Sequence, residues 1–298
     1  MPFKATAAHF ECSFYTILPS GTLRPYRIYF NLPQPVGVIG NCPQQTRVSG
    51  RMSRANPTGH ENGSKRRQDA QMATDDPCAP IRNAATDRPF VVAQLGQSLD
   101  GRVATATGES RWINGEAALD HLHRLRASVD AVIVGVGTVL ADDPLLNVRR
   151  VTGQHPARVV IDPAGRLPDC ARCLSHDGVT RIVIRASEQT APPGVEVVRL
   201  GTNGRVIPPT AIVEALFARG FKRLLVEGGA RTVSQFIDAG AIDRLHVLIA
   251  PLIIGSGKTG LDLAPISKLS AAPRPQARVH VFHDGDVLFD CDLKVRSG

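Results

Sequence analysis

LLVEGGARTVSQF, residues 224–236, contains the junction that decides the fold. An apolar run typical of a buried strand ends on the acid Glu227, passes through Gly228-Gly229 and continues with helical spacing. Parallel α/β sheets bind ligands beyond the carboxyl ends of their strands, and glycines there let helix N-terminal N–H groups approach an anion. The stretch therefore predicts a ligand site. A plain tight turn is the alternative, but it leaves the carboxylate in the last buried position unexplained.

Apolar strands and helical patterns alternate on both sides of this junction, which predicts an α/β fold with a central, mostly parallel sheet. Near the C-terminus Asp284-Gly285 is typical of a hairpin turn, which adds antiparallel strands at one edge. The predicted strands are 89–95, 130–136, 157–162, 181–186, 195–200, 223–228 and 244–251. The predicted helices are 115–127, capped by Asn114, 208–220 with Pro at its start, and 230–240.

Residues 1–86 differ from the rest of the chain, because they are rich in Pro, Gly, Asn, Gln, Arg and Ser. A segment of this composition buries too little apolar surface to offset the entropy of ordering it. We therefore expect a low-complexity segment over 1–86, disordered from about residue 40, with a hairpin within 10–40. The regular pattern that follows predicts one domain over 87–298.

The composition, 43% hydrophobic and 21% charged over 298 residues, is that of an ordinary globular protein. No apolar run approaches the roughly 20 residues of a membrane helix, and the N-terminus lacks the pattern of a secretion signal. These features predict a cytoplasmic protein without membrane contact. The net charge is +8, and residues 1–86 hold 10 Lys/Arg against 5 Asp/Glu. A basic arm can bind nucleic acid, but no aromatic-rich basic patch accompanies it, so a solvated tail is the simpler interpretation.

Two phosphate-binding motifs are incomplete. GSGKTG, residues 255–260, ends like a nucleoside-triphosphate loop, but Leu252 stands where that loop needs its first glycine. A turn after a strand is the expected structure. The dinucleotide fingerprint fails too, because Gly135-Val136-Gly137 is followed by Leu140 at the third glycine position.

Metal chemistry is not predicted. Cys170 and Cys173 have metal or redox spacing, but no second Cys/His pair is placed to serve, so two reduced cysteines in a surface loop are expected. His9-Phe10-Glu11 with Pro77-Cys78 faintly matches the zinc-deaminase pattern, but no further cysteine follows at a workable spacing.

Two other stretches point to a ligand. Residues 96–113 place Ser110 and Trp112 after a strand, where they suit hydrogen bonding to and stacking on a flat heterocycle. Residues 124–149 hold a strand, Gly-x-Gly-Thr and a short helix between Arg126 and Arg149, and arginines are good phosphate ligands. A loop in which the tryptophan simply packs, and ordinary surface arginines, are the alternatives.

Taken together and in this order, the stretches resemble the reductase domain of the bacterial riboflavin-biosynthesis deaminase/reductase. The resemblance covers about 88–295. It rests on SLDGR (98–102), GESRWI (108–113), HRLRASVDAVIVGVGTVLADDPLLNVR (123–149), VVID (159–162), VEGGART (226–232) and IAPLIIGSG (249–257). It implies a dihydrofolate-reductase-like three-layer fold and NADPH-dependent reduction of 5-amino-6-(5-phosphoribosylamino)uracil. The 2,5-diamino precursor, or another heterocycle reduced by a dihydrofolate reductase relative, is the alternative substrate.

The resemblance also implies site residues and a homodimer. Substrate contacts would be Ser110, Arg126, Leu146, Arg149 and Glu227. Cofactor contacts would be Gly96, Trp112, Thr138, Asp142, Gly229, Ala230, Arg231, Thr232, Val233, Ser234 and Gln235. Glu227 and Asp142 are the candidate catalytic carboxylates.

The chain departs from the family pattern in two places. An 86-residue segment without zinc ligands replaces the N-terminal deaminase, so deaminase activity is not expected. Pro163 stands where some relatives have a serine near the cofactor. We further hypothesise that Arg185, at a strand end, reads the 2′-phosphate of NADPH.

Overall fold

The computed structural model describes residues 10–17, 23–30 and 76–296, and the chain divides into two units, Met1–Gly59 and His60–Gly298. In the first unit, β1 (Phe10–Ile17) and β2 (Leu23–Phe30) pair antiparallel from Phe10↔Phe30 to Ile17↔Leu23, as the hairpin expected within 10–40. The expectation of disorder for residues 40–75 lies outside the described residues.

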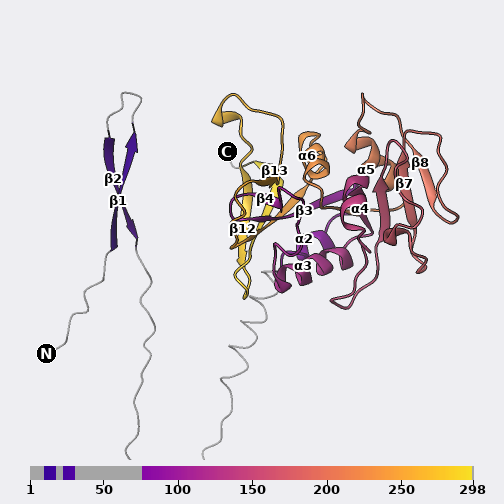
Figure 1. Ribbon diagram of the computed structural model, residues 1–298, viewed down its shortest axis with the longest axis horizontal. Coiled ribbons are helices and arrows are strands. Elements are labelled where there is room, and N and C mark those ends of the chain that lie inside the picture. Colours follow the sequence, from indigo (N-terminus) through magenta and orange to yellow (C-terminus); the bar gives the residue numbers. More distant parts are fainter. Residues whose placement is uncertain (1–9, 18–22, 31–75, 297–298) are drawn as a thin grey trace, which may run out of the picture. The chain divides into compact units, whose positions relative to one another are not determined.

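The second unit is built on a nine-stranded sheet in the order β12-β13-β10-β3-β9-β5-β6-β7-β8 (Figure 1). From β10 to β8 all neighbours are parallel, and β13 pairs antiparallel with both β10 and β12. The strands are β3 (Phe90–Ser98), β5 (Ala131–Gly135), β6 (Ala157–Ile161), β7 (Arg181–Arg185), β8 (Glu196–Arg199), β9 (Arg223–Glu227), β10 (Arg244–Ala250), β12 (Pro275–Val281) and β13 (Val287–Arg296). This confirms the predicted parallel sheet with a C-terminal antiparallel hairpin.

Helices cover both faces of the sheet and complete three layers. On one face α5 (Pro209–Phe217) and α6 (Ala230–Asp238) pack against side chains such as Val91 and Ile133. On the other face α2 (Ala79–Arg82), α3 (Glu116–Ala127) and α4 (Val136–Asp142) enclose Val92 and Val132. Successive strand residues thus enter opposite cores, which is why these strands are apolar throughout instead of alternating.

The folded unit begins before residue 87. Cys78 and Ile81 are 1% and 0% exposed and belong to the core on the α3 face. Residues 76–86 were expected within the low-complexity segment. Their four-residue helix is too short to leave a periodic pattern, so nothing in this segment predicts that its apolar side chains complete a core formed by residues further along the chain.

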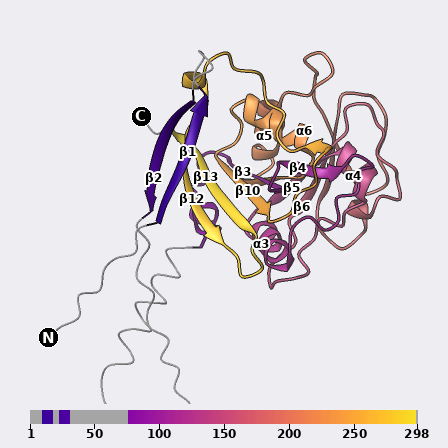
Figure 2. The same cartoon turned by 60° about the vertical axis from the view of Figure 1, so that its left-hand side comes forward.

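The two strands at the antiparallel edge are joined by the predicted turn. Gly285 has φ +93°, and Gly285 N donates to the Phe282 carbonyl. Figure 2 shows β12 and β13 beside β10 at this edge of the sheet. A separate two-stranded sheet pairs β4 (Arg102–Thr105) with β11 (Gly257–Thr259). Among the described residues, no helix has the length and apolar character needed to cross a bilayer.

Candidate active site

A pocket of about 670 Å³ lies at the carboxyl ends of the parallel strands. Gln94 and Gly96 of β3, Glu227 of β9, Gly135 of β5 and Ile161 of β6 all contribute to its wall. These are the strand ends at which open α/β sheets bind ligands. The wall also includes residues of β4 and β11 and residues within the segments 108–114, 161–166 and 205–212.

The two glycines after Glu227 have to be glycines. Gly228 and Gly229 have φ of +63° and +66°, a region that side chains with a Cβ rarely adopt. A Cβ on Gly229 would also lie 2.7 Å from Thr138 Oγ1 of α4. The turn therefore brings the N-terminus of α6 into the pocket wall, with the partial positive charge that favours a bound anion.

The Glu227 carboxylate forms a two-point ion pair with Arg126 of α3. Arg126 Nε donates to Glu227 Oε2 at 2.8 Å, Arg126 Nη2 donates to Oε1, and Nη1 donates to the Asn147 carbonyl at 2.9 Å. Both side chains are almost buried, at 5% and 12% exposure. Arg126 is not part of the pocket wall, and its two bonds to Glu227 orient a carboxylate that is.

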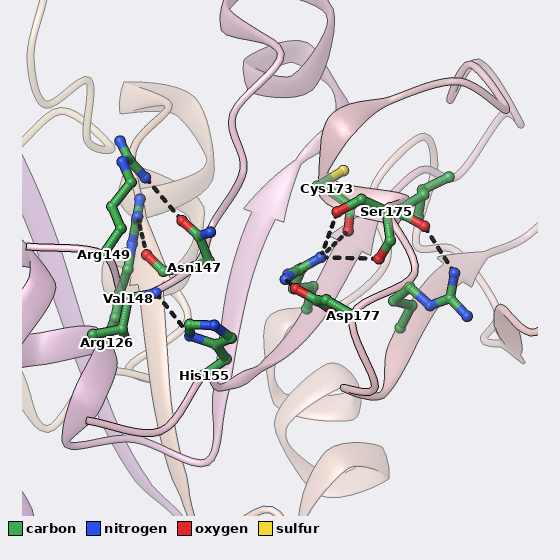
Figure 3. Close-up of polar contacts among 11 residues, drawn as sticks. Arg126, Asn147, Val148, Arg149, His155, Cys173, Ser175 and Asp177 are labelled. Carbon is green, nitrogen blue, oxygen red and sulfur yellow. Dashed lines mark hydrogen bonds and ion pairs between the residues drawn. The ribbon is translucent and has the colours of Figure 1, made fainter. Parts of the chain in front are cut away.

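Arg149 bonds to the side chain of Asn147, the residue whose backbone carbonyl accepts from Arg126 (Figure 3). Arg149 Nη1 donates to Asn147 Oδ1 at 3.0 Å, and its backbone N donates to His123 Nδ1 at 3.1 Å. Arg149 as a whole is exposed. The turn before it depends on Leu146, which is 1% exposed and has φ +55°.

Most of the sequence-predicted site residues line the pocket, and five do not. Those that line it are Gly96, Ser110, Trp112, Thr138, Asp142, Glu227, Gly229, Ala230, Arg231, Thr232 and Gln235. Those outside its wall are Arg126, Leu146, Arg149, Val233 and Ser234. Val233 is a core residue, and Ser234 Oγ accepts a hydrogen bond from Asp262 N. In a helix that presents one end to a ligand, only the first turn and one face can reach it.

The hypothesis that Arg185 reads a 2′-phosphate is wrong. Arg185 is 2% exposed, lies 3.5 Å from Asp162, and donates to the Gln189 carbonyl at 3.1 Å and to that of Thr190. Strand position suggested a pocket residue, but the side chain points into the crossover after β7. The exposed arginines that do line the pocket are Arg166, Arg205 and Arg231.

The expectation that both cysteines lie in a surface loop is also wrong, because Cys173 is buried. Cys170 is exposed, whereas Cys173 is 0% exposed, and burial raises the pKa of its thiol to about 11. Arg158 donates to the carbonyls of Cys173 and Ser175 and to Ser175 Oγ, which fixes this segment (Figure 3). A single 3₁₀ turn gives no periodic pattern by which the sequence could have shown the burial.

Lys258 and Thr259, from the motif discarded as a turn, lie in the pocket wall on β11. Asp100 of SLDGR holds the preceding loop, because its carboxylate accepts hydrogen bonds from Ile254 N and Gly255 N. With the bond from Ser98 Oγ as the largest cause, these bonds lower the pKa of Asp100 to about 2. No short stretch of sequence predicts that β11 pairs with β4, because some 150 residues of the chain separate the two strands.

Within residues 10–17, 23–30 and 76–296, no group of three acidic, histidine or cysteine side chains is arranged to hold a metal ion. The donor set at the pocket instead suits an organic anion. Arg166, Arg205, Arg231 and Lys258 contribute positive charge to its wall, and Asp142 and Glu227 contribute negative charge.

Residues 89–282 match the family model described as the RibD C-terminal domain. The chain is 39% identical over 219 residues to the 2,5-diamino-6-ribosylamino-4(3H)-pyrimidinone 5′-phosphate reductase of Methanothermobacter thermautotrophicus, covering 70% of this chain and 99% of that protein. It is 38% identical over 184 residues to the riboflavin biosynthesis protein RibD of Aquifex aeolicus, covering 59% of this chain and 50% of that one. The chain thus spans about half the length of the RibD proteins it matches.

A crystal structure of a diaminohydroxyphosphoribosylaminopyrimidine deaminase/5-amino-6-(5-phosphoribosylamino)uracil reductase from Thermotoga maritima has the same fold. It superposes with a TM-score of 0.61 at 31% identity, covering 69% of this chain and 57% of that one. The predicted reductase-domain fold is therefore confirmed.

Proposed function

Because the chain belongs to the RibD C-terminal domain family, we propose that it reduces a ribosylaminopyrimidine 5′-phosphate with NADPH. The observation that carries the proposal is the pocket at the strand ends, where Glu227 and the N-terminus of α6 meet. The substrate proposed first is 5-amino-6-(5-phosphoribosylamino)uracil, reduced to its ribitylamino product. The 2,5-diamino compound is the second candidate. It is favoured by the Methanothermobacter reductase, because this chain matches 99% of that protein and the name of that protein contains the compound.

The residues present fit a dinucleotide. A Cβ at Gly229 would fill the space between Thr138 and the first turn of α6, so the glycine leaves room for a pyrophosphate at the helix N-terminus. Arg166 and Arg205 are exposed and line the pocket, and we propose that they bind the 2′-phosphate and so favour NADPH over NADH. Trp112 lines the pocket and is 69% exposed, and we propose that it covers a bound ring.

The chemistry needs the sugar ring to open before reduction. The C1′–O4′ bond breaks, its electron pair leaves with O4′, which gains a proton, and the nitrogen loses its proton as the C1′=N bond forms. Nicotinamide, when bound, supplies the hydride that reaches C1′, and the nitrogen takes up one proton. The main task of the protein is therefore to position the two reactants.

Three side chains divide the remaining work in this proposal. Glu227, fixed by Arg126, orients the hydroxyl that ring opening releases. Asp142, half-buried at the end of α4 and without an ion-pair partner among the described residues, moves the proton. Arg149, free on its outer side, binds the 5′-phosphate.

The test is an assay of purified protein by loss of NADPH absorbance. The uracil substrate, its 2,5-diamino precursor and dihydrofolate are assayed in parallel, each with NADPH and with NADH. We expect turnover of one or both ribosylamino compounds. Turnover of dihydrofolate alone, or of nothing, contradicts the proposal.

We also propose that the protein is a homodimer. β12 is an edge strand with Val279 and Val281 exposed by 54% and 74%, and exposed apolar edges are surfaces that proteins normally cover. Light scattering coupled to gel filtration should give twice the mass of 31.9 kDa. Val281→Lys should shift the protein to monomer, and a monomeric wild type would contradict the proposal.

A further inference from the structure

The segment that leads into α3 is fixed at its end by a cap from a distant part of the chain. Asn114 was predicted to cap this helix, but no side chain of its own segment does so. Two carboxylates from the turn between β12 and β13 bind there instead. Gly115 N donates to Asp286 Oδ2 at 2.8 Å, and Ala117 N donates to Asp284 Oδ2 at 2.9 Å. The residues before Gly115 therefore start from a fixed point.

Residues 106–113 connect β4 to this point and have few ties to the rest of the protein. Most of their hydrogen bonds stay within the segment or reach only the end of β4. Glu109 N donates to Thr105 Oγ1 at 3.0 Å, and the Glu109 carbonyl accepts from Thr105 N at 2.8 Å. The segment nevertheless contributes Ser110 and Trp112 to the pocket wall. The position of these two side chains thus depends on what else holds the segment.

Arg111 makes the one hydrogen bond that, within the described residues, joins this segment to any part of the chain beyond Thr105. Its Nη2 donates to the Asp142 carbonyl at the end of α4. The last carbonyls of a helix lack partners within it, and a cation there also suits the helix dipole. The acceptor is itself held in place, because Asp143 Oδ1 accepts from Arg172 N at 2.8 Å. Arg111 therefore ties the segment to a supported helix end.

The bond does not occupy the space of a ligand. Arg111 lies outside the pocket wall, whereas its neighbours Ser110 and Trp112 line the pocket, as does Asp142. A side chain in this place can set the position of its neighbours without touching the ligand. A binding group that is already in position spares the ligand the entropy cost of ordering it.

We propose that Arg111 is a positioning residue, which holds Ser110 and Trp112 in the pocket wall through its bond to the Asp142 carbonyl. The inference rests on the proposed function for the ligand, NADPH, whose ring Trp112 covers under that proposal. The tether itself concerns the ligand-free protein and can be tested there.

The motion of Trp112 can be followed directly, because it is the only tryptophan of the chain. Arg111→Met removes the donors, and Arg111→Lys keeps a charge and a donor. Arg199→Met is the matched control, since Arg199 is also exposed and donates to a backbone carbonyl, that of Glu188, but lies outside the pocket wall. Time-resolved fluorescence anisotropy of the free protein should show more nanosecond motion of Trp112 in Arg111→Met, less in Arg111→Lys, and the wild-type decay in Arg199→Met.

The ligand measurements separate positioning from direct contact. We expect Arg111→Met to raise the dissociation constant of NADPH about fivefold and to leave kcat close to the wild-type value, because the bound ligand orders the segment. Arg199→Met should leave both unchanged. Since Arg111 acts through Trp112 on this ligand, adding Arg111→Met to Trp112→Ala should weaken NADPH binding by less than about twofold.

Three results overturn the inference. One is an anisotropy decay in Arg111→Met that matches the wild type, and another is normal NADPH binding by that variant. The third is a full fivefold loss when Arg111→Met is added to Trp112→Ala, because Arg111 would then act on NADPH by its own charge. If the wild type binds no NADPH, the proposed function fails, and the anisotropy decay alone decides whether Arg111 holds Trp112.

Discussion

Arg126 of α3 and Glu227 of β9 form a two-point ion pair beneath the floor of the pocket, although 101 residues separate them in the sequence. Arg126 lies outside the pocket wall, and the pair gives Glu227 one fixed orientation. It also places a charged group from each of two layers in a nearly dry environment, where neither is tolerated without the other.

Removal of one partner should therefore be costly. Arg126→Met leaves Glu227 buried and unpaired, and we expect the free energy of unfolding in urea to fall by about 3–5 kcal/mol. Arg126→Met/Glu227→Leu should recover most of that loss while remaining inactive. The control is Arg150→Met, which breaks exposed ion pairs to Glu116 and Asp120 and should cost at most about 1 kcal/mol. Equal losses at both arginines would contradict the role of the pair.

Alanine variants of Gly228, Gly229 and Gly240 should distinguish the effect of backbone strain on stability from the effect of the glycine turn on ligand binding. Gly228→Ala and Gly240→Ala both place a Cβ at positive φ, +63° and +64°, without a close contact, so each should lose roughly 1–2 kcal/mol. Gly229→Ala should lose more, because its Cβ would meet Thr138 Oγ1 at 2.7 Å. Gly240 lies at the far end of α6, so its variant should bind NADPH normally, whereas Gly229→Ala should bind it at least tenfold more weakly. Normal binding by Gly229→Ala in a fluorescence titration would remove the pyrophosphate from this turn.

Arg166 and Arg205 should set the choice between the two nicotinamide cofactors. Each Arg→Gln change removes one charge-assisted bond, so we expect KM for NADPH to rise about tenfold and KM for NADH to stay constant. Arg219→Gln is the control, since Arg219 pairs with Glu196 on the surface outside the pocket. An NADPH/NADH preference that survives the double variant would place the 2′-phosphate elsewhere.

A buried cluster beneath the antiparallel edge should make the fold sensitive to acid. His121 Nε2 lies 3.0 Å from His246 Nδ1, and His246 Nε2 lies 3.1 Å from Asp290 Oδ1. Burial lowers the pKa of His121 to about 3 and also lowers that of His246. Although burial alone would raise it, hydrogen bonds from His246 and Arg244 lower the pKa of Asp290 to about 2.

The direction in which stability changes with pH depends on whether the unfolded or the native state binds more protons. Below about pH 6.5 the unfolded chain protonates these histidines and the native protein does not, so stability falls with falling pH, for His121 down to about pH 3. The part due to Asp290 is lost only below about pH 4. His121→Leu should reduce the slope of unfolding free energy between pH 6 and 4.5 by about 1.4 kcal/mol per pH unit. Leu125→Ala, on the same helix, should lower stability equally at each pH, and an unchanged slope in His121→Leu would assign the acid sensitivity to other groups.

The layers and the parallel strands could be predicted because each strand carries its own apolar run and each long helix its own periodicity. The role of Glu227 and the two glycines could be predicted as well, because the strand end, the turn and the helix start are contiguous in the sequence. Contacts between segments that are distant in the sequence could not be predicted. The pairing of Lys258 with Ala104, the burial of Cys173, and the engagement of Arg126 and Arg185 depend on side chains brought together only by the fold.

Asn114 shows why a correct local rule can fail. Asparagine before a helix is a good cap in isolation, but the carboxylates of Asp284 and Asp286 satisfy the same N–H groups and carry full negative charge at the positive end of the helix. A rule based on neighbouring residues cannot anticipate a competitor some 170 residues away.

That remote cap also fixes the order in which the protein can mature on the ribosome. Helix α3, which supplies Arg126, emerges early, whereas Asp284 and Asp286, which hold its first turn, are made about 170 residues later. Translation at about 5–20 residues per second separates the two events by roughly ten to thirty seconds. Every residue of the pocket wall, which extends to Thr259, is made before Asp284, so the first turn of α3 is the last part of this site to gain its hydrogen-bond partners.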